Sequence, residues 1–312
     1  MAPPIIIIGT RGSPLALAQA REIEARLAKS RPELAEKGSI ALSVIRTTGD
    51  QTIDRPLYEM GGKGLFTKEI EEALLDRRID LAVHSVKDLP AFLPAGLAVV
   101  CVPLREDPRD ILFSPRAASI SALPQGASLG TSSPRRRAQA LALRPDLEIR
   151  PLRGNVETRL NKVRRGEADA TLLALAGLRR LGLEKEATSV LSADEILPAV
   201  GQGALGIECR EDDQRIREFL KPLNHAPSAT CVAAERALLA ALEGSCRTPI
   251  AALAELAGDV TLYLRALVAS FDGRNVIRTE RRGPAADAAR MGADAGAELR
   301  AKAGDNFFAE PV

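Results

Sequence analysis

The chain has 312 residues, with 43 Lys and Arg against 41 Asp and Glu, so its formal net charge is only +2. This balance excludes a surface that is basic throughout, as binding to nucleic acid or anionic lipid would favour, but it allows a local basic cleft. Hydrophobic residues make up 46% of the chain and aromatic residues 3%, with no Trp. We therefore expect an aliphatic core in two or three domains, with few aromatic platforms for single-stranded nucleic acid.

Neither a membrane span nor a metal site is predicted. The longest apolar stretch, 91–104, is interrupted by Pro94 and Pro103, whereas a spanning helix needs about 20 apolar residues. The N-terminus lacks the basic region of a signal peptide, so we expect a cytoplasmic protein with reduced thiols. The cysteines form no C-x-x-C pair and the two histidines lie far apart, which argues against zinc or iron–sulfur binding. The four cysteines are Cys101, Cys209, Cys231 and Cys246.

The first part of the chain alternates between strand and helix signals. Strands are predicted at 5–9, 40–46, 80–83 and 97–102, and helices at 14–29 and 66–77. Ser13 is the expected N-cap of the first helix, and Pro14 suits its first position. This alternation predicts an α/β domain with largely parallel strands.

A second α/β unit follows. Strands are predicted at 128–130, 147–151 and 170–174, and helices at 134–143 and 156–165. The segments 9–14 and 130–134 share one pattern: a strand, Gly-Thr, a polar loop, then Ser-Pro opening a helix. We interpret this pattern as a weak internal repeat, with two helix N-termini facing a shared cleft, although chance similarity remains an alternative.

The last part of the chain has a different character. Helices are predicted at 229–242 and 285–302, and strands at 250–256, 260–270 and 275–281. Strands grouped between two helices predict a smaller α+β domain with an antiparallel sheet.

Arginines recur where predicted strands lead into helices. The helix dipole disfavours cations in a first helical turn by up to ~1 kcal/mol, unless an anion is bound there. Several guanidinium groups in such loops predict a compact ligand with several carboxylates or phosphates. A solvated basic face is the alternative interpretation. The arginines concerned are Arg11, Arg135, Arg136, Arg137, Arg153 and Arg159.

Three further segments could contribute chemistry. Gly61-Gly62-Lys63-Gly64 does not match a nucleotide P-loop and suits either a glycine hinge carrying one cation or a plain turn. Asp88 follows a predicted strand, where it could stabilise a cationic intermediate or move protons, or simply pair with Lys87 or an arginine. Cys246 lies in a loop beside Arg247, which favours a reactive thiolate. His84 alone is more typical of a structural histidine, and no protease-type Cys-His or Ser-His-Asp arrangement is evident.

Together these segments resemble porphobilinogen deaminase, also called hydroxymethylbilane synthase, nearly from end to end. Each segment is modest alone, but their order is highly specific. The matching segments are 10–17, 61–66, 82–88, 105–110, 130–136, 152–155, 197–203 and 242–246.

The resemblance implies a cytosolic transferase of porphyrin, haem and tetrapyrrole biosynthesis. Such enzymes join four porphobilinogen molecules head to tail, release ammonia, and hydrolyse the product to hydroxymethylbilane. A dipyrromethane cofactor primes the chain through a thioether to the cysteine that matches Cys246, and Asp88 matches the catalytic aspartate. Lys63 matches the lysine of a mobile loop. The other positions implied to bind cofactor or substrate are Arg11, Ser13, Lys87, Thr131, Ser133, Arg135, Arg136, Arg153, Arg159, Arg180 and Gln202.

The resemblance also implies a fold and a domain division. Two α/β domains like those of periplasmic binding proteins, 1–103 with 200–221 and 104–199, flank a cleft, and an α+β domain, 222–312, carries the cofactor cysteine. Ser245 stands where the family usually has Gly, which affects only the conformation expected of that loop. The implied partner is porphobilinogen, bound by a monomer without metal, nucleic acid or membrane.

The residues agree with this resemblance in their chemistry. Each porphobilinogen brings two carboxylates, which arginine forks on several loops can neutralise. A carboxylate among cations suits the positive charge that develops as ammonia leaves. The alternative from another class is a non-catalytic binding protein for a polycarboxylate anion, which would not need Cys246. A nucleic-acid-binding module is disfavoured by net charge and by the scarcity of aromatic residues.

Overall fold

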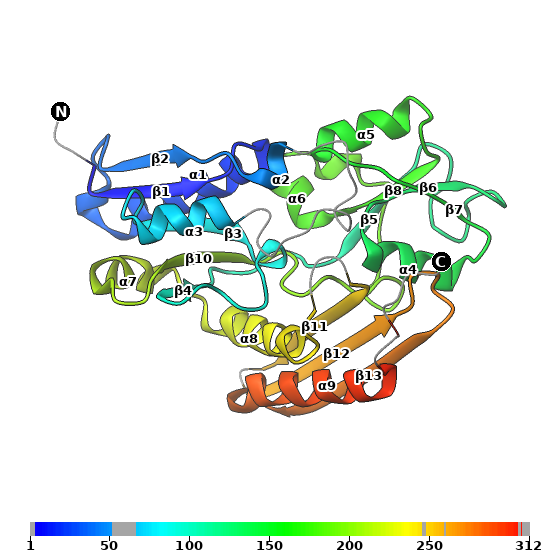
Figure 1. Cartoon of the computed structure of the whole chain (residues 1–312). Helices are drawn as coiled ribbons and strands as arrows, with labels where there is room; N and C mark the ends of the chain where they lie inside the picture. Colours follow the sequence, from blue (N-terminus) through cyan, green and yellow to red (C-terminus); the bar gives the residue numbers. More distant parts are fainter. Residues whose placement is uncertain (1–3, 52–66, 245–247, 259, 305–306, 308–312) are drawn as a thin grey trace. The chain divides into compact units, whose positions relative to one another are not determined.

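Three β-sheets organise the part of the chain that the computed structural model describes, residues 4–51, 67–244, 248–258, 260–304 and 307 (Figure 1). The chain divides into two compact units. The described residues of unit 1 fall within 1–54, 61–105 and 204–229, and those of unit 2 within 106–203 and 230–312. The three-domain division inferred from the resemblance stays a prediction.

Unit 1 contains a five-stranded sheet in the order β2-β1-β3-β10-β4. Its strands are β1 (Ile6–Thr10), β2 (Ile40–Val44), β3 (Leu81–Ser85), β4 (Leu97–Cys101) and β10 (Leu205–Arg210). Its α-helices are α1 (Pro14–Ser30), α2 (Thr48–Gln51), α3 (Lys68–Leu75) and α7 (Gln214–Leu220). Alternate residues of the strands form two apolar clusters, one shared with α1 and α7 and the other with α3. The sheet therefore has helices on both faces, as a largely parallel sheet requires.

Unit 2 contains a second five-stranded sheet, in the order β7-β6-β8-β5-β9. Its strands are β5 (Asp110–Phe113), β6 (Ser128–Gly130), β7 (Glu148–Arg150), β8 (Ala170–Ala174) and β9 (Ser189–Val190). Its helices are α4 (Pro134–Leu143), α5 (Val156–Arg164) and α6 (Leu175–Arg180). α4 packs in one apolar cluster of the sheet, and α5 and α6 pack in the other.

The two sheets have the same topology, which confirms the internal repeat. In the first sheet β1 pairs in parallel with β2 and β3, and in the second sheet β6 pairs in parallel with β7 and β8. In each sheet one antiparallel strand then lies between this group and the remaining edge strand, β4 or β9. The antiparallel strands are β10 and β5. The two glycines of the repeated pattern also have the same role. A Cβ on Gly9 would lie 2.3 Å from Ile79, and one on Gly130 would lie 2.8 Å from Leu152.

Some boundaries differ from the sequence prediction. The strand predicted at 80–83 is β3, so His84 and Ser85 belong to the strand and the following turn begins at Val86. The strands β5, β9 and β10 were not predicted as elements. β9 has only two residues, too few for a recognisable pattern. β10 is buried throughout, but its charged residues Glu208 and Arg210 interrupt the apolar run that a buried strand normally has.

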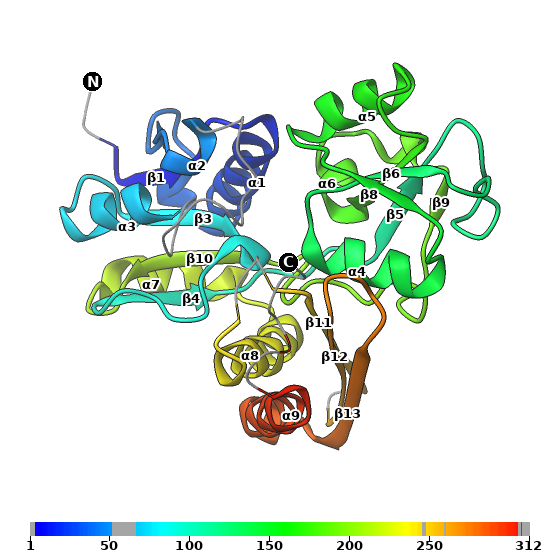
Figure 2. The same ribbon diagram turned by 45° about the vertical axis from the view of Figure 1, so that its right-hand side comes forward.

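A three-stranded antiparallel sheet, β11-β12-β13, completes unit 2 and confirms the predicted C-terminal arrangement. Its strands are β11 (Ile250–Ala257), β12 (Thr261–Ala269) and β13 (Val276–Pro284), and the flanking helices are α8 (Ala226–Ala241) and α9 (Ala288–Ala303). α8 and α9 lie side by side against this sheet (Figure 2). Gly292 and Gly296 permit the contact, because a Cβ on Gly292 would lie 2.0 Å from the carbonyl oxygen of Ala234.

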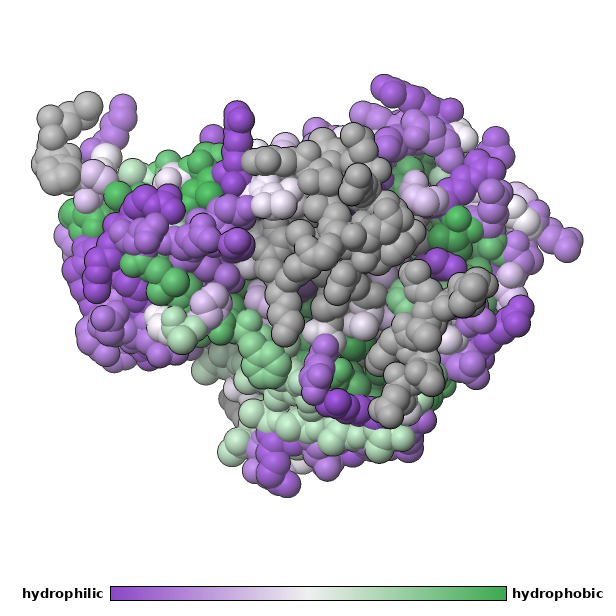
Figure 3. Space-filling view, in the orientation of Figure 1, coloured by the Kyte–Doolittle hydropathy of each residue, from purple (hydrophilic) through white to green (hydrophobic). Residues whose placement is uncertain are grey.

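Short 3₁₀ turns link several of these elements. The turns are Pro32–Leu34, Val86–Asp88, Glu184–Glu186, Lys221–Leu223 and Ala285–Asp287. In Figure 3, hydrophilic residues cover the visible surface of α3 and α7. Within the described ranges, no helix has the length and hydropathy needed to cross a membrane.

Candidate functional site

The polar residues that the sequence analysis singled out follow the carboxyl ends of parallel strands, where open α/β sheets bind ligands. In unit 1, β1 leads through Arg11 and Ser13 into α1, and β3 leads into the turn Val86–Asp88. Since β1 and β3 are parallel neighbours, their loops emerge at the same edge of the sheet.

The loop after β1 is fixed by the start of α1. Ser13 is the N-cap, as predicted: its Oγ accepts a hydrogen bond of 3.2 Å from the backbone N–H of Ala16. Thr10, which is fully buried, donates from Oγ1 to the carbonyl of Ala16 at 3.1 Å. These bonds fix the backbone of the loop that carries Arg11.

The turn that carries Asp88 is anchored to the neighbouring strand and helix. The backbone N–H of Val86 donates to the carbonyl of Ala204 at 3.0 Å. The buried side chain of Gln19, on α1, donates to Ser85 Oγ at 2.8 Å. Gly206 of β10 has no side chain, and a Cβ there would lie 3.1 Å from Val86. The turn thus packs closely on β10, so Asp88 has a defined position.

A cavity of about 40 Å³ opens between these loops within unit 1. Arg11, Ser13 and Asp88 line its polar part. Gln19, Thr67, His84 and Ser85 also contribute polar groups to the lining. A space of this size holds a water or a small polar group rather than a whole substrate.

Asp88 is the exposed carboxylate of this cavity. Within the described ranges it forms no ion pair, which argues against the alternative of an Asp88 salt bridge to Lys87 or a nearby arginine. Lys87, next to it on the turn, is half-buried. An unpaired carboxylate beside Arg11 can interact electrostatically with a cationic group that enters the cavity.

In unit 2, the corresponding loop after β6 begins α4. Ser133 is again the N-cap, and its Oγ accepts from the N–H of Arg136 at 3.4 Å. Thr131 is buried, and its Oγ1 accepts from the N–H of Ser133 at 3.2 Å. The predicted Ser-Pro helix start is therefore confirmed in both units.

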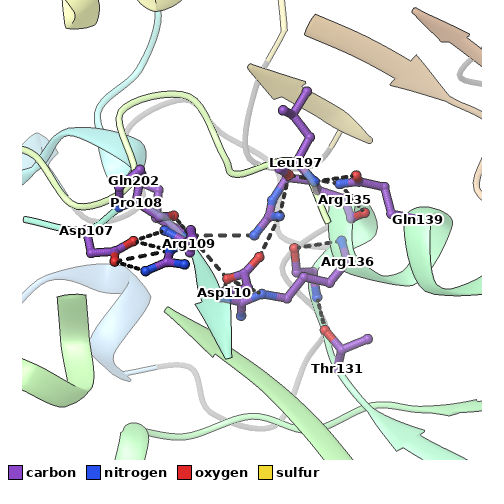
Figure 4. Close-up of polar contacts among 11 residues, drawn as sticks. Asp107, Pro108, Arg109, Asp110, Thr131, Arg135, Arg136, Gln139, Leu197 and Gln202 are labelled. Atoms are coloured by element: carbon purple, nitrogen blue, oxygen red, sulfur yellow. Dashed lines mark hydrogen bonds and ion pairs between the residues drawn. The ribbon is translucent and has the colours of Figure 1, made fainter. Parts of the chain in front are cut away.

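Arg135 and Arg136 form a buried network with Asp110 (Figure 4). Arg135 Nη1 lies 2.8 Å from Asp110 Oδ2, and Arg136 Nη2 lies 2.7 Å from Asp110 Oδ1. Gln202, which is fully buried, donates from Nε2 to Asp110 Oδ1 at 3.0 Å. Arg135 also donates to the carbonyl of Leu197 at 2.8 Å. Arg135, Arg136 and Gln202 are thus brought together around a carboxylate of the chain itself, and their binding of cofactor or substrate stays a prediction.

This network changes the interpretation of the arginines. Burial alone would raise the pKa of Asp110, but the charges of Arg135 and Arg136 outweigh it and hold that pKa well below its ordinary range. The anion that offsets the helix dipole is therefore Asp110, which the sequence analysis assigned no role. The alternative of a solvated basic face is wrong for Arg135 and Arg136, because their exposures are only 5% and 7%.

A second helix start in unit 2 carries Arg153 and Arg159. Asn155 caps α5, and its Oδ1 accepts from the N–H of Thr158 at 2.8 Å. Gly154 has φ +120°, a conformation that favours glycine and turns the chain tightly after Arg153. Arg153 Nη1 is buried without a hydrogen-bond partner among the described residues. Such an orphaned donor fits an anionic ligand.

Two more predicted residues lie near this edge of the sheet in unit 2. Arg180, at the end of α6, donates to the carbonyl of Gly203 at 3.1 Å. Arg159, on the first turn of α5, donates to the carbonyl of Asn155 at 3.4 Å. Ser132 Oγ, between Thr131 and Ser133, is a further buried polar atom without a partner in the described part of the chain. The sequence analysis did not single out Ser132.

Lys63 and Cys246, two of the predicted site residues, lie outside the described residues, as does Ser245. The segment before Cys246 is described as far as Gly244. Glu243 has φ +50°, and a Cβ on Gly244 would lie 2.3 Å from Ile250. The other three cysteines are buried and form no disulfide with one another. Burial raises the pKa of Cys101 to about 12 and that of Cys209 to about 11, which makes both poor nucleophiles.

Comparison with known proteins assigns these features to a family. The family model described as "Porphobilinogen deaminase, dipyromethane cofactor binding domain" matches residues 6–218, and "Porphobilinogen deaminase, C-terminal domain" matches residues 229–301. A periplasmic substrate-binding protein of an ABC transporter from Coxiella burnetii resembles the chain in structure, with 17% identity and a TM-score of 0.42. That likeness covers 74% of this chain and 96% of the other.

Curated relatives share far more sequence. The "Porphobilinogen deaminase" of Nitrobacter winogradskyi is 56% identical over 96% of this chain and 94% of its own length. The "Porphobilinogen deaminase, chloroplastic" of Oryza sativa subsp. japonica is 52% identical over 97% of this chain and 86% of its own length. With two family models that together cover most of its length, the chain belongs to the porphobilinogen deaminase family.

Proposed function

We propose that this chain joins four porphobilinogen molecules head to tail, releases ammonia, and yields hydroxymethylbilane, with Asp88 as the catalytic carboxylate. The observation that carries the proposal is the geometry of Asp88. This carboxylate is exposed and unpaired among the described residues, on a turn anchored to β10 and α1, and it lines a cavity with Arg11 and Ser13. Asp88 stabilises the positive charge that develops on the substrate ring as ammonia leaves.

The arginines at the helix starts bind the carboxylates of the growing chain. Arg153 Nη1 and Ser132 Oγ supply buried donors that find no partner among the described residues. A dipyrromethane cofactor is rich in carboxylates and fits such donors. Arg135 and Arg136 act differently: they are held by Asp110 and fix the start of α4, where they present the helix N-terminus and Thr131 to the ligand. The other cations that bind carboxylates of the cofactor or substrate are Arg11, Lys87, Arg159 and Arg180.

Cys246 attaches the cofactor through a thioether. When bound, the dipyrromethane would supply the free terminal pyrrole carbon to which the first substrate ring is joined, and each later ring would be joined to the end of the growing chain. Cys246 follows Gly244, the last described residue of this segment, where a Cβ would lie 2.3 Å from Ile250. The raised pKa values of Cys101 and Cys209 support Cys246 as the attachment site. Lys63 contacts the ligand from its glycine-rich segment.

The organisation inferred from the resemblance completes the proposal. Residues 1–103 with 200–221 and residues 104–199 form two domains around the active cleft, and residues 222–312 carry the cofactor. The enzyme acts as a monomer in the cytoplasm, which fits its buried free thiols.

Turnover stoichiometry distinguishes this enzyme from a non-catalytic polycarboxylate-binding protein. We expect the purified chain to release one ammonia for each porphobilinogen consumed and to form one hydroxymethylbilane for every four. A binding protein would retain porphobilinogen without releasing ammonia. Arg153→Leu should lower turnover and cofactor content at unchanged thermal stability, and normal values of both would remove Arg153 from the site.

A further inference from the structure

Three ionisable side chains are buried together in unit 1, beneath the end of β3. Glu208 of β10 is fully buried, and the exposures of His84 on β3 and Glu71 on α3 are 5% and 7%. α3 packs against both strands. Buried acids and histidines normally have full hydrogen-bond partners, because their desolvation is costly. This cluster, Glu71–His84–Glu208, has no assigned role in the reaction.

The sheet register brings His84 and Glu208 together. In the antiparallel pair β3–β10, Gly206 lies opposite His84 and Glu208 lies opposite Ala82. His84 and Glu208 are therefore diagonal neighbours on one face of the sheet. Their side chains are in contact, with His84 Nε2 at 2.9 Å from Glu208 Oε2, and the contact is an ion pair when His84 is protonated. Because Gly206 has no side chain, nothing from that position separates the two.

Several polar atoms of the cluster remain unsatisfied. Glu208 Oε1 and Oε2, His84 Nε2 and Glu71 Oε1 make no hydrogen bond with any group in the described ranges. For Glu208, the contact with His84 thus provides charge compensation rather than a well-aligned hydrogen bond. A buried carboxylate with so little hydrogen bonding needs a neighbouring cation to remain ionised.

The number of charges in the cluster indicates which of its three side chains carry a proton. If both acids were ionised, the cluster would hold two negative charges against at most one positive charge in a buried site. Burial raises the pKa of Glu71 above its ordinary value, and the charge of Glu208 acts in the same direction. With Glu71 neutral, a protonated His84 and an ionised Glu208 form a pair without net charge.

His84 also lines the cavity that contains Asp88. Its Nε2 is directed to Glu208, so Nδ1 is the ring nitrogen left to interact with the cavity. Among the described residues, the charged groups around His84 are Glu208 on β10, Glu71 on α3 and, at the cavity, Arg11 and Asp88. In the described part of the chain, the cations beside Asp88 are then Lys87 on the same turn and, at the cavity, Arg11 and a protonated His84.

We propose that the cluster keeps one proton on Glu71 and one on His84, so that His84 is a cation at the Asp88 cavity. His84 is then a positioning residue: its charge, fixed by Glu208, keeps the Asp88 carboxylate ionised between condensations. The proton that each new pyrrole ring loses accordingly passes to the released ammonia or to solvent water rather than remaining on Asp88. The catalytic part of this inference rests on the role proposed for Asp88.

The charge of His84 can be measured without turnover. The chain has only two histidines, His84 and His225, so ¹⁵N-histidine labelling of the holoenzyme gives two imidazole signals, which a His225→Gln variant assigns. We expect both ring nitrogens of His84 to carry protons at pH 7. Glu208→Gln should convert His84 to a neutral ring, whereas Glu71→Gln should leave it charged, because Gln mimics a protonated Glu. A neutral His84 in the unmodified holoenzyme at pH 7 would overturn the proposal.

The pH profile of kcat tests the effect on Asp88. Removal of a nearby cation favours protonation of a carboxylate, so the acidic limb should move to higher pH, by about one unit, in His84→Gln and in Glu208→Gln. KM at neutral pH should change little. Glu72→Gln, which alters an exposed acid on the same helix, is the matched control and should have the unmodified profile. A uniform loss of kcat without movement of the limb would show that the pair is only structural.

Two further results keep the test decisive. If His84→Gln does not fold, Glu208→Gln provides the same comparison, because it removes the partner of His84 and leaves the ring in place. If Asp88→Asn retains full activity, the proposed function of Asp88 fails, yet the NMR signals of His84 still decide the charge of the cluster.

Discussion

Asp88, on the turn after β3, and Asp110, the first residue of β5, have the same side chain in two different environments. We infer that they have different roles. Asp88 is exposed, with no ion pair in the described ranges, whereas Asp110 is fully buried between two arginines and Gln202. A buried, paired carboxylate contributes to the fold, while an exposed, anchored one remains available to a ligand. Substitutions of the two should therefore affect different measurements.

Asp88→Asn should reduce turnover by 10²-fold or more, because one preorganised charge is worth roughly 3–4 kcal/mol of transition-state stabilisation. The free energy of unfolding should change by less than about 0.5 kcal/mol, as expected of an exposed side chain without an ion pair. Porphobilinogen consumption and urea unfolding of the same preparation check both parts. Near-normal consumption would remove Asp88 from the mechanism.

Arg135→Leu should lower the free energy of unfolding by about 3 kcal/mol, because it deprives a buried carboxylate of one of its cations. The resemblance found in the sequence implied instead that Arg135 binds cofactor or substrate. Arg137→Leu, in the same helical turn, is the matched control and should change stability by about 0.5 kcal/mol or less. Equal stability of both variants would contradict the structural role of the Asp110 network.

The network around Asp110 also determines how the free energy of unfolding changes with pH. The pKa of Asp110 is lowered in the folded protein, so its stabilising contribution is complete above the ordinary carboxyl range. That contribution is lost only as the pH falls below this range. Denaturation of the Arg135 and Arg137 variants should accordingly be compared near pH 7, where Asp110 is ionised in both the folded and the unfolded chain.

At the scale of elements, the sequence predicted features that depend on neighbouring residues, such as helix starts. It did not predict features that depend on residues far apart in the chain. Ser13-Pro14 and Ser133-Pro134 mark helix starts because a capping hydroxyl and a proline act within one turn. Strands β5 and β10 run antiparallel to their neighbours β8 and β3. Their direction depends on where the chain enters each sheet, and no short sequence pattern indicates this. Asp110 was missed for the same reason, since its partners Arg135 and Arg136 lie some distance away along the chain. The grouping of the C-terminal strands between two helices, by contrast, predicted their antiparallel sheet.

The contact between α8 and α9 depends on two glycines. Gly292→Ala would raise the helix propensity of α9 by about 1 kcal/mol, yet the new Cβ would lie 2.0 Å from the carbonyl oxygen of Ala234. We expect the clash to outweigh the propensity, so the melting temperature should fall. Ala293→Gly, at an exposed position of the same helix, is the reference for propensity alone. A Gly292→Ala protein more stable than the unmodified one would show that the two helices can separate without cost.

At the scale of the whole molecule, the central claim is that the chain carries its own covalent primer. Cys101, Cys209 and Cys231 are buried, while Cys246 follows a helix end in the region matched by the C-terminal family model. A covalent pyrrole pair on one cysteine explains how polymerisation begins on a binding surface rich in arginine. The claim concerns a bond, so mass rather than activity tests it most directly.

The decisive measurement is the intact mass of the purified, denatured protein, followed by peptide mapping. We predict an excess over the bare chain equal to two pyrrole units, carried by the peptide that contains Cys246. The excess should be absent from inactive Cys246→Ala and present in Cys231→Ala. An unmodified mass in a preparation that still forms hydroxymethylbilane would contradict the account, and an adduct on another cysteine would overturn the assignment of Cys246.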